Sequence, residues 1–163
     1  MKGRKIKSLP YIKFSEDKDD PYRIDKIPDG AYCEQCGIVY IDKNWKLKAI
    51  EREKKVPIIC PACRKINDKY YMGVLTISGE FLKEHKDEII NLIKNEEKKL
   101  RSKNSLPRIA LIEELNGAIV VNTTSVRMAY RIGKALNNAY KGDFSIKWSD
   151  NNVFTRVYWS RDI

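Results

Sequence analysis

Four cysteines in two identically spaced pairs constrain this chain more than any other feature of its sequence. Cys33 and Cys36 form one CxxC pair, Cys60 and Cys63 form the second, and 23 residues separate the two pairs. Thiolates two residues apart can hold one side of a zinc ion, and two such pairs complete a tetrahedral site. The spacing therefore predicts a Zn²⁺ site with all four cysteines as ligands. Because no position remains open for water, we expect a structural rather than a catalytic metal.

Three other uses of the cysteines compete with zinc. Two disulfide bonds would need an oxidising compartment, which nothing in the sequence suggests. A thioredoxin-like redox site would use one CxxC pair and leave the other surplus. An iron–sulfur cluster takes the same four ligands. Zinc is favoured, and the cluster stays open as an alternative.

The segment around the cysteines, residues 31–68, is predicted to be a zinc ribbon. Residues 38–41 and 45–50 have strand character, and residues 42–44 form a turn between them. A unit of this size cannot bury a sufficient hydrophobic core, so the metal is expected to supply the missing stabilisation.

Residues 69–163 alternate strand and helix patterns in the order βαββαββ. Strands are expected at 71–77, 108–115, 118–122, 144–148 and 153–159, and helices at 79–103, capped by Ser78, and at 125–141, capped by Thr123 or Thr124. Asn116 and Gly117 between two apolar runs predict a hairpin. The fold class is therefore α+β: a four-cysteine zinc ribbon followed by a ferredoxin-like βαββαβ domain with an extra C-terminal strand.

The charge of the chain favours a polyanionic partner. Lys and Arg outnumber Asp and Glu by 32 to 22, a net charge of +10. Residues 1–30 are expected to form a flexible arm whose first 13 residues carry five basic and no acidic side chains. The expected nucleic-acid contacts come from this arm and from the ribbon, with Trp45 as a candidate for stacking on bases. They are Lys2, Arg4, Lys5, Lys7, Lys13, Lys46, Lys48, Arg64 and Lys65.

Several classes of protein are disfavoured by the sequence. No apolar run approaches the length of a membrane span, and no apolar signal-peptide core follows the basic start, so we expect a cytoplasmic protein. Only one histidine is present, His85, and no phosphate-binding glycine loop or nucleophile motif occurs. We therefore expect neither an enzyme nor a small-molecule substrate, and we expect a monomer.

Parts of the sequence resemble a group of small zinc-ribbon proteins of bacteria and archaea. The stretches that carry this resemblance are Cys33–Gly37, Cys60–Lys65, Gly73–Ile89 and Gly117–Leu136. More distantly, the cysteine pairs followed by a segment ending in an Arg-Val-Tyr-Trp strand are similar to the large-ribosomal-subunit nuclear export adaptor family. That family has more CxxC pairs than this chain. The resemblance implies association with the ribosome, and no residue-level site beyond the four cysteines.

These observations lead to one functional expectation and two alternatives. We expect a zinc-stabilised RNA-binding protein that associates with the ribosome, through its large subunit or ribosomal RNA, in assembly, quality control or dormancy. The alternatives are a DNA-associated or transcription-linked zinc ribbon and a protein-docking adaptor. RNA and DNA are hard to separate from charge alone, because phosphate contacts carry no base or sugar information.

Overall fold

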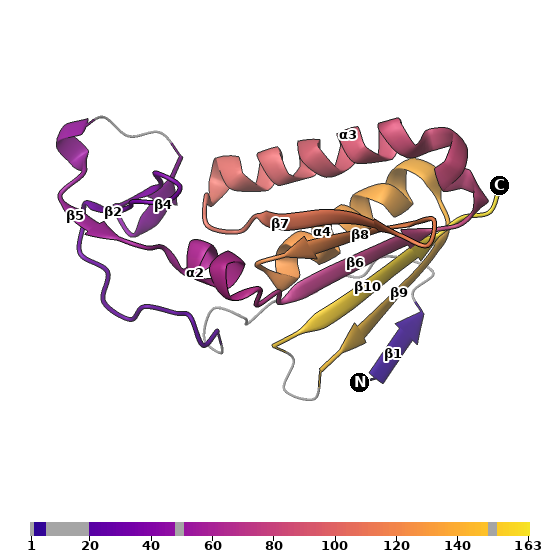
Figure 1. The fold of residues 1–163 in the computed structure, drawn as a ribbon, viewed down its shortest axis with the longest axis horizontal. Helices are drawn as coiled ribbons and strands as arrows, with labels where there is room; N and C mark the ends of the chain where they lie inside the picture. Colours follow the sequence, from indigo (N-terminus) through magenta and orange to yellow (C-terminus); the bar gives the residue numbers. More distant parts are fainter. Residues whose placement is uncertain (1, 6–19, 48–50, 150–152) are drawn as a thin grey trace.

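Two β-sheets and three α-helices make up the described part of the chain, residues 2–5, 20–47, 51–149 and 153–163 of a computed structural model (Figure 1). The fold class is thus mixed α+β, as predicted. Lys7, Lys13 and Lys48 of the predicted nucleic-acid contacts lie outside the described residues. Within them, no helix combines the length and the apolar character that crossing a membrane requires.

The larger sheet has six strands in the order β1-β9-β10-β6-β8-β7. Asn116 and Gly117 both have positive φ at the tip of the β7–β8 hairpin, which confirms that turn. The strands are β1 (Lys2–Lys5), β6 (Gly73–Ser78), β7 (Ile109–Leu115), β8 (Ala118–Thr123), β9 (Asp143–Trp148) and β10 (Thr155–Ser160).

The order of these strands differs from the predicted ferredoxin-like order with a strand added to it. Strand β10 does form a hairpin with β9, but it also pairs in parallel with β6 and so separates β9 from β6. Its side chains explain this position. Val157 and Trp159 are fully buried. Burial of such apolar side chains contributes more stability in the middle of the sheet than at its edge.

Two helices pack on one face of this sheet, α3 (Glu80–Lys103) and α4 (Val126–Tyr140). Ile89 and Ile93 from α3 and Ile132 and Leu136 from α4 are completely buried against the inward side chains of the strands. This apolar contact fixes the helices to the sheet.

Both helix starts differ from the predicted caps. Gly79, with φ of 107°, precedes α3, and Ser78 is the last residue of β6. The backbone N–H of Phe81 donates instead to the carbonyl oxygen of Arg161 at 3.0 Å. Ser125 rather than either threonine caps α4, because its hydroxyl accepts from the N–H of Met128.

The smaller sheet has the order β4-β3-β2-β5 and lies at one end of the molecule (Figure 1). An eight-residue helix, α2 (Pro61–Asp68), follows it and was not predicted. The remaining elements are β2 (Ala31–Cys33), β3 (Val39–Ile41), β4 (Asn44–Lys46), the 3₁₀ turn η1 (Glu51–Glu53) and β5 (Val56–Ile58). We call residues 20–69, which contain this sheet and α2, the cysteine module.

The predicted arm is not uniform. Residues 2–5 form strand β1, which pairs antiparallel with β9 at the edge of the large sheet. Residues 20–30 belong to the cysteine module, and the hydroxyl of Tyr22 donates to Asp68 of α2 at 2.6 Å. Both ends of the segment expected to be a flexible arm are therefore attached to folded elements.

Candidate metal centre

The first cysteine pair lies at the end of strand β2. The chain turns directly after Cys33, and Gly37 adopts φ of 85°, a left-handed conformation that glycine enters without steric cost. The N–H of Gly37 donates to the carbonyl of Cys33 at 2.8 Å, and the N–H of Cys33 donates to the carbonyl of Ile38 at 2.8 Å. These bonds close a tight loop that brings Cys36 back beside Cys33.

The second pair lies at the start of helix α2. Cys60 is the N-cap, and its sulfur accepts from the N–H of Cys63 at 3.4 Å. Pro61 occupies the first turn, where its missing N–H costs no helical bond. The N-terminal end of a helix carries partial positive charge, which favours the thiolate forms that bind metal.

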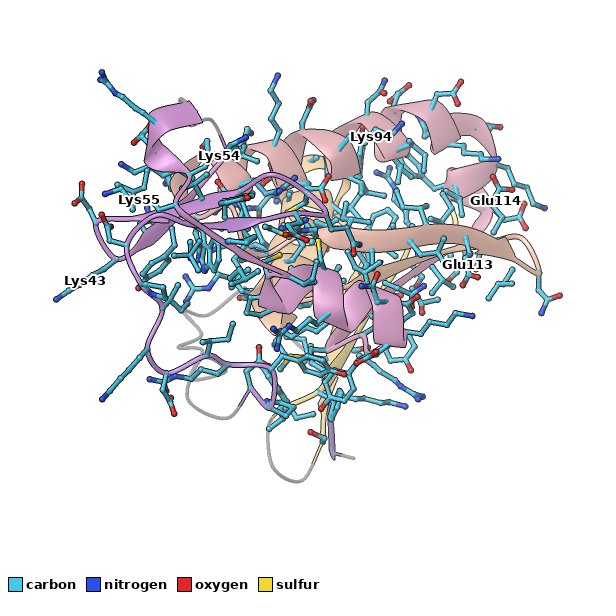
Figure 2. All side chains as sticks on the ribbon, turned by 60° about the vertical axis from the view of Figure 1, so that its left-hand side comes forward. Lys43, Lys54, Lys55, Lys94, Glu113 and Glu114 are labelled. Atoms are coloured by element: carbon cyan, nitrogen blue, oxygen red, sulfur yellow. The ribbon has the colours of Figure 1, made fainter. Side chains whose placement is uncertain are left out.

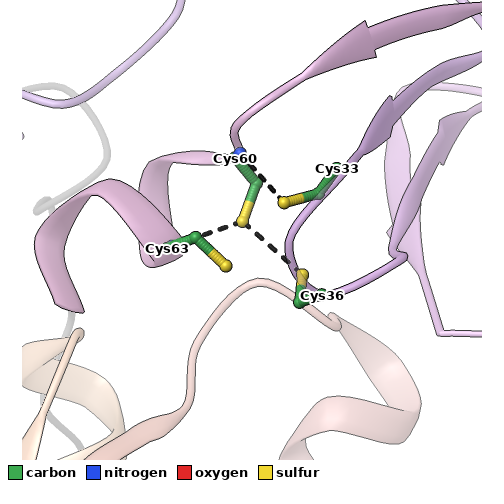
Figure 3. A group of neighbouring side chains, drawn as sticks. All are labelled: Cys33, Cys36, Cys60 and Cys63. Carbon is green, nitrogen blue, oxygen red and sulfur yellow. Dashed lines mark hydrogen bonds between the residues drawn. The ribbon is translucent and has the colours of Figure 1, made fainter. Parts of the chain in front are cut away.

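The four sulfur atoms converge on one point between β2 and α2 (Figure 3). All four Sγ atoms lie within 4.8 Å of one another, and those of Cys36 and Cys60 are 3.8 Å apart. A tetrahedron with Zn–S distances of about 2.3 Å has sulfur–sulfur edges of roughly 3.8 Å. A disulfide would need about 2.05 Å, and all four cysteines are free. The group is therefore compatible with a zinc site and not with two disulfide bonds.

The protonation of the thiols depends on their mutual contacts. The hydrogen bond with Cys60 lowers the pKa of Cys36 to about 4, and the same bond, together with burial, raises the pKa of Cys60. Burial and the neighbouring Cys36 raise the pKa of Cys63 to about 11. Because burial and their mutual contacts favour the protonated forms of Cys60 and Cys63, binding of a divalent metal requires protons to leave these thiols.

A buried arginine from outside the cysteine module contacts the cysteine group. Arg108 immediately precedes β7, and its Nη1 and Nη2 atoms lie 3.7 Å from Sγ of Cys63 and 3.8 Å from Sγ of Cys60. Arg108 is only 6% exposed. Four thiolates around a divalent metal carry a net charge of −2, and this guanidinium offsets part of it beside the buried Cys60 and Cys63. Sequence reasoning missed Arg108, because it stands alone before an apolar run.

Apolar side chains surround the cysteines. Ile38, Trp45 and Ala62 are buried with Cys33, Cys60 and Cys63, and Leu106 packs on the same cluster from outside the module. Trp45 is 6% exposed, so the expectation that it stacks on nucleic-acid bases is wrong. Its indole is part of the apolar shell of the cysteine group.

The predicted nucleic-acid contacts do not gather in one place. Lys46 and Arg64 are exposed on the cysteine module. Lys65 is 5% exposed, forms an ion pair with Asp20, and donates to the carbonyl of Thr124 at 3.0 Å. Lys65 is therefore a structural residue of the junction between the module and the large sheet, and its assignment to nucleic-acid binding is corrected. Lys2, Arg4 and Lys5 belong to β1, at the far edge of the large sheet (Figure 1).

Other lysines gather at one end of the molecule. Lys43, Lys54 and Lys55 extend around the small sheet, whereas Glu113 and Glu114 lie on the opposite side of the same view (Figure 2). We call Lys43, Lys46, Lys54 and Lys55 the basic end. Lys43, Lys46 and Lys55 are exposed, and none of the described carboxylates forms an ion pair with them. Of the four, only Lys46 is a contact predicted from the sequence.

Comparison with known proteins adds no further identification: no family model, curated protein or solved structure matches the chain.

Proposed function

We propose that this chain is a zinc-stabilised RNA-binding protein that associates with the ribosome, through its large subunit or ribosomal RNA, in the cytoplasm. The observation that carries the proposal is the basic end, where the exposed Lys43, Lys46 and Lys55 extend from a small sheet next to a closed four-cysteine group. The resemblance to the ribosomal export adaptor family supports the same proposal.

Neutralisation of RNA phosphates is the role that we assign to the exposed lysines of the basic end. Each exposed lysine that meets a phosphate releases a condensed counterion, which makes binding favourable and dependent on salt. A metal that fixes strands β2–β5 keeps Lys43, Lys46 and Lys55 at set distances from one another. The metal then contributes to binding by positioning charges, without taking part in any reaction.

Salt titration of RNA binding tests this proposal. On single-stranded RNA, the slope of log affinity against log salt should become shallower by about 0.7 for each phosphate that is no longer neutralised. The triple variant Lys43→Ala, Lys46→Ala, Lys55→Ala should therefore reduce the slope by up to about 2. The control is Lys94→Ala, Lys98→Ala, Lys141→Ala, which removes the same charge from exposed positions elsewhere.

Two results would contradict the proposal. Equal slopes for the two triple variants would remove the basic end from the interaction. Sedimentation of the protein away from ribosomal particles at low salt, with and without DNase, would remove the ribosome and favour a protein-docking role. Loss of co-sedimentation on DNase treatment would instead favour a DNA partner.

A further inference from the structure

A cavity of about 330 Å³ lies where the cysteine module meets the large sheet and its helices. Helix α2 contributes Ala62 and Lys65, the end of α3 contributes Leu100 and Lys103, and the first turns of α4 contribute Arg127 and Arg131. The cavity is separate from the cysteine group, since none of the four cysteines lines it. Its size is at the lower end of the range usual for small-molecule sites.

Cations predominate among the described residues that line this cavity. Four of these lining residues are cations, Lys65, Lys103, Arg127 and Arg131, and one, Asp20, is acidic. Asp20 pairs with Lys65, and Glu96 lies 3.3 Å from Nε of Arg131. Among the described lining residues, cations thus outnumber carboxylates by four to one. A concave surface with low-dielectric walls concentrates such a field and favours an anionic group.

The geometry of the cations also suits one compact anion. Arg127 and Arg131 are four residues apart on α4, so their side chains emerge on the same side of the helix. Lys103 approaches from the end of α3, and the buried ammonium of Lys65 is held by Asp20 and by the carbonyl of Thr124. Guanidinium groups bind phosphate oxygens through paired N–H donors, which makes phosphate the best-matched anion.

Part of the cavity wall is apolar. Leu100, Leu106 and Pro107 line it beside the cations. A free inorganic ion would use only the charged part, whereas a phosphate attached to a flat, largely apolar ring would use both parts. The combination is typical of small-molecule sites, in which apolar walls carry a few placed polar groups.

We propose that this cavity binds a nucleoside monophosphate unit, carried either by a free nucleotide or by the 5′ end of an RNA strand. The phosphate lies among Lys103, Arg127 and Arg131, and the base lies against Leu106 and Pro107. The RNA form of the proposal rests on the proposed function, and the free-nucleotide form does not.

The cavity also depends on the metal centre. Ala62 lies between Cys60 and Cys63, and Lys65 follows two residues later, so the wall formed by α2 exists only where the second cysteine pair is in place. Chelation of zinc should therefore abolish nucleotide binding. By the same linkage, bound nucleotide should slow the removal of zinc.

Calorimetric titration of the full chain tests the site with defined probes: adenosine, AMP, and a pentaribonucleotide with either a 5′ phosphate or a 5′ hydroxyl. The double variant Lys103→Ala, Arg127→Ala should weaken binding of a phosphorylated probe at least tenfold. Both side chains are exposed, so the variant should fold, which thermal unfolding checks. The control Lys94→Ala, Lys98→Ala should bind like the unaltered chain.

The probes also separate the sources of the phosphate. Binding of AMP identifies a free nucleotide as sufficient, and binding of only the 5′-phosphorylated RNA identifies the strand end. Three outcomes would overturn the proposal. Neither AMP nor the 5′-phosphorylated RNA binds, adenosine binds as tightly as AMP, or the double variant binds as tightly as the control. The Lys43, Lys46, Lys55 variant should keep AMP binding, so failure of the cavity and failure of the basic end are distinguishable.

Discussion

The cysteine module and the large sheet are built by one chain, yet different interactions stabilise them. Among the residues that the structure describes, the core of the large sheet and its helices has seventeen buried members and no cysteine. The buried cluster of the module has six described members, and half of them are the metal-ligand candidates Cys33, Cys60 and Cys63. A unit that buries so little apolar surface needs a cross-link, whereas the large sheet can fold on hydrophobic burial alone.

Removal of the metal should reveal the largest difference in stability between the two regions. Structural zinc contributes about 10–16 kcal/mol in small metal-dependent domains. A strong chelator, or Cys60→Ser, should therefore unfold residues 31–66 while β6–β10, α3 and α4 keep their structure. Amide NMR spectra report both regions in one sample, and metal analysis should give one zinc per unaltered chain.

The opposite outcomes are equally informative. Full dispersion of the module signals in Cys60→Ser would show that the metal does not hold it. Collapse of the large sheet in the same variant would show that the halves share one core. A chain without zinc that carries iron would favour the cluster alternative.

A substitution that creates a cavity in the core of the large sheet should destabilise that sheet and leave the cysteine module intact. Ile132 is completely buried on α4, and Ile132→Ala should lower the free energy of unfolding by about 2–5 kcal/mol. Zinc content should stay at that of the unaltered chain, because Ile132 belongs to the other cluster. Denaturant titration measures the loss, and Asn138→Ala, at an exposed position on the same helix, should change little. Loss of zinc from Ile132→Ala would break the distinction between the regions.

Arg108 joins the two regions, so its replacement should affect the metal from outside the module. Groups that hydrogen-bond to metal ligands typically contribute 10- to 100-fold to metal affinity. Arg108→Met should weaken zinc binding by about that factor, as measured by competition with a coloured chelator. Arg64→Met is the control, because Arg64 is exposed and its Nε donates to the carbonyl of Ile59. Equal zinc affinities in the two variants would assign Arg108 to packing alone.

The smallest expected effect is that of replacing one glycine by alanine in each region. Gly37 and Gly117 have φ of 85° and 81°, and a Cβ at either position meets no atom within 4 Å. Alanine should therefore cost about 1 kcal/mol of backbone strain at each site. Gly37→Ala should weaken zinc affinity roughly fivefold, and Gly117→Ala should lower the stability of the large sheet. A change in zinc affinity caused by Gly117→Ala would show that the regions are coupled.

Local features of this fold were predictable from the sequence. The hairpin at Asn116 and Gly117 depends on residues that tolerate positive φ, and the cysteine group depends on spacing. Helix α2 was missed although Pro61 after Cys60 is a helix-start signal, because a metal-binding turn accounts for the same residues, 60–65.

Long-range features were not predictable. The ammonium of Lys65 forms an ion pair with Asp20 and donates to the carbonyl of Thr124, groups far away in the chain. Lys65 is therefore buried, although lysines are usually exposed. Arg108 reaches the cysteines in the same way. Strand β10 pairs with β6 because its apolar side chains fit the middle of the sheet. Periodicity identifies a strand and does not identify its neighbours.

The central place of β10 has a consequence for the folding kinetics. Gly73 lies opposite Thr155, roughly eighty residues later in the chain, so a long loop must close before β6 gains its parallel neighbour. Until that step, β6 and the hairpin of β9 and β10 each present an unpaired edge, which is open to pairing with a second chain. We therefore expect slow folding of the large sheet, with aggregation during refolding that grows with protein concentration.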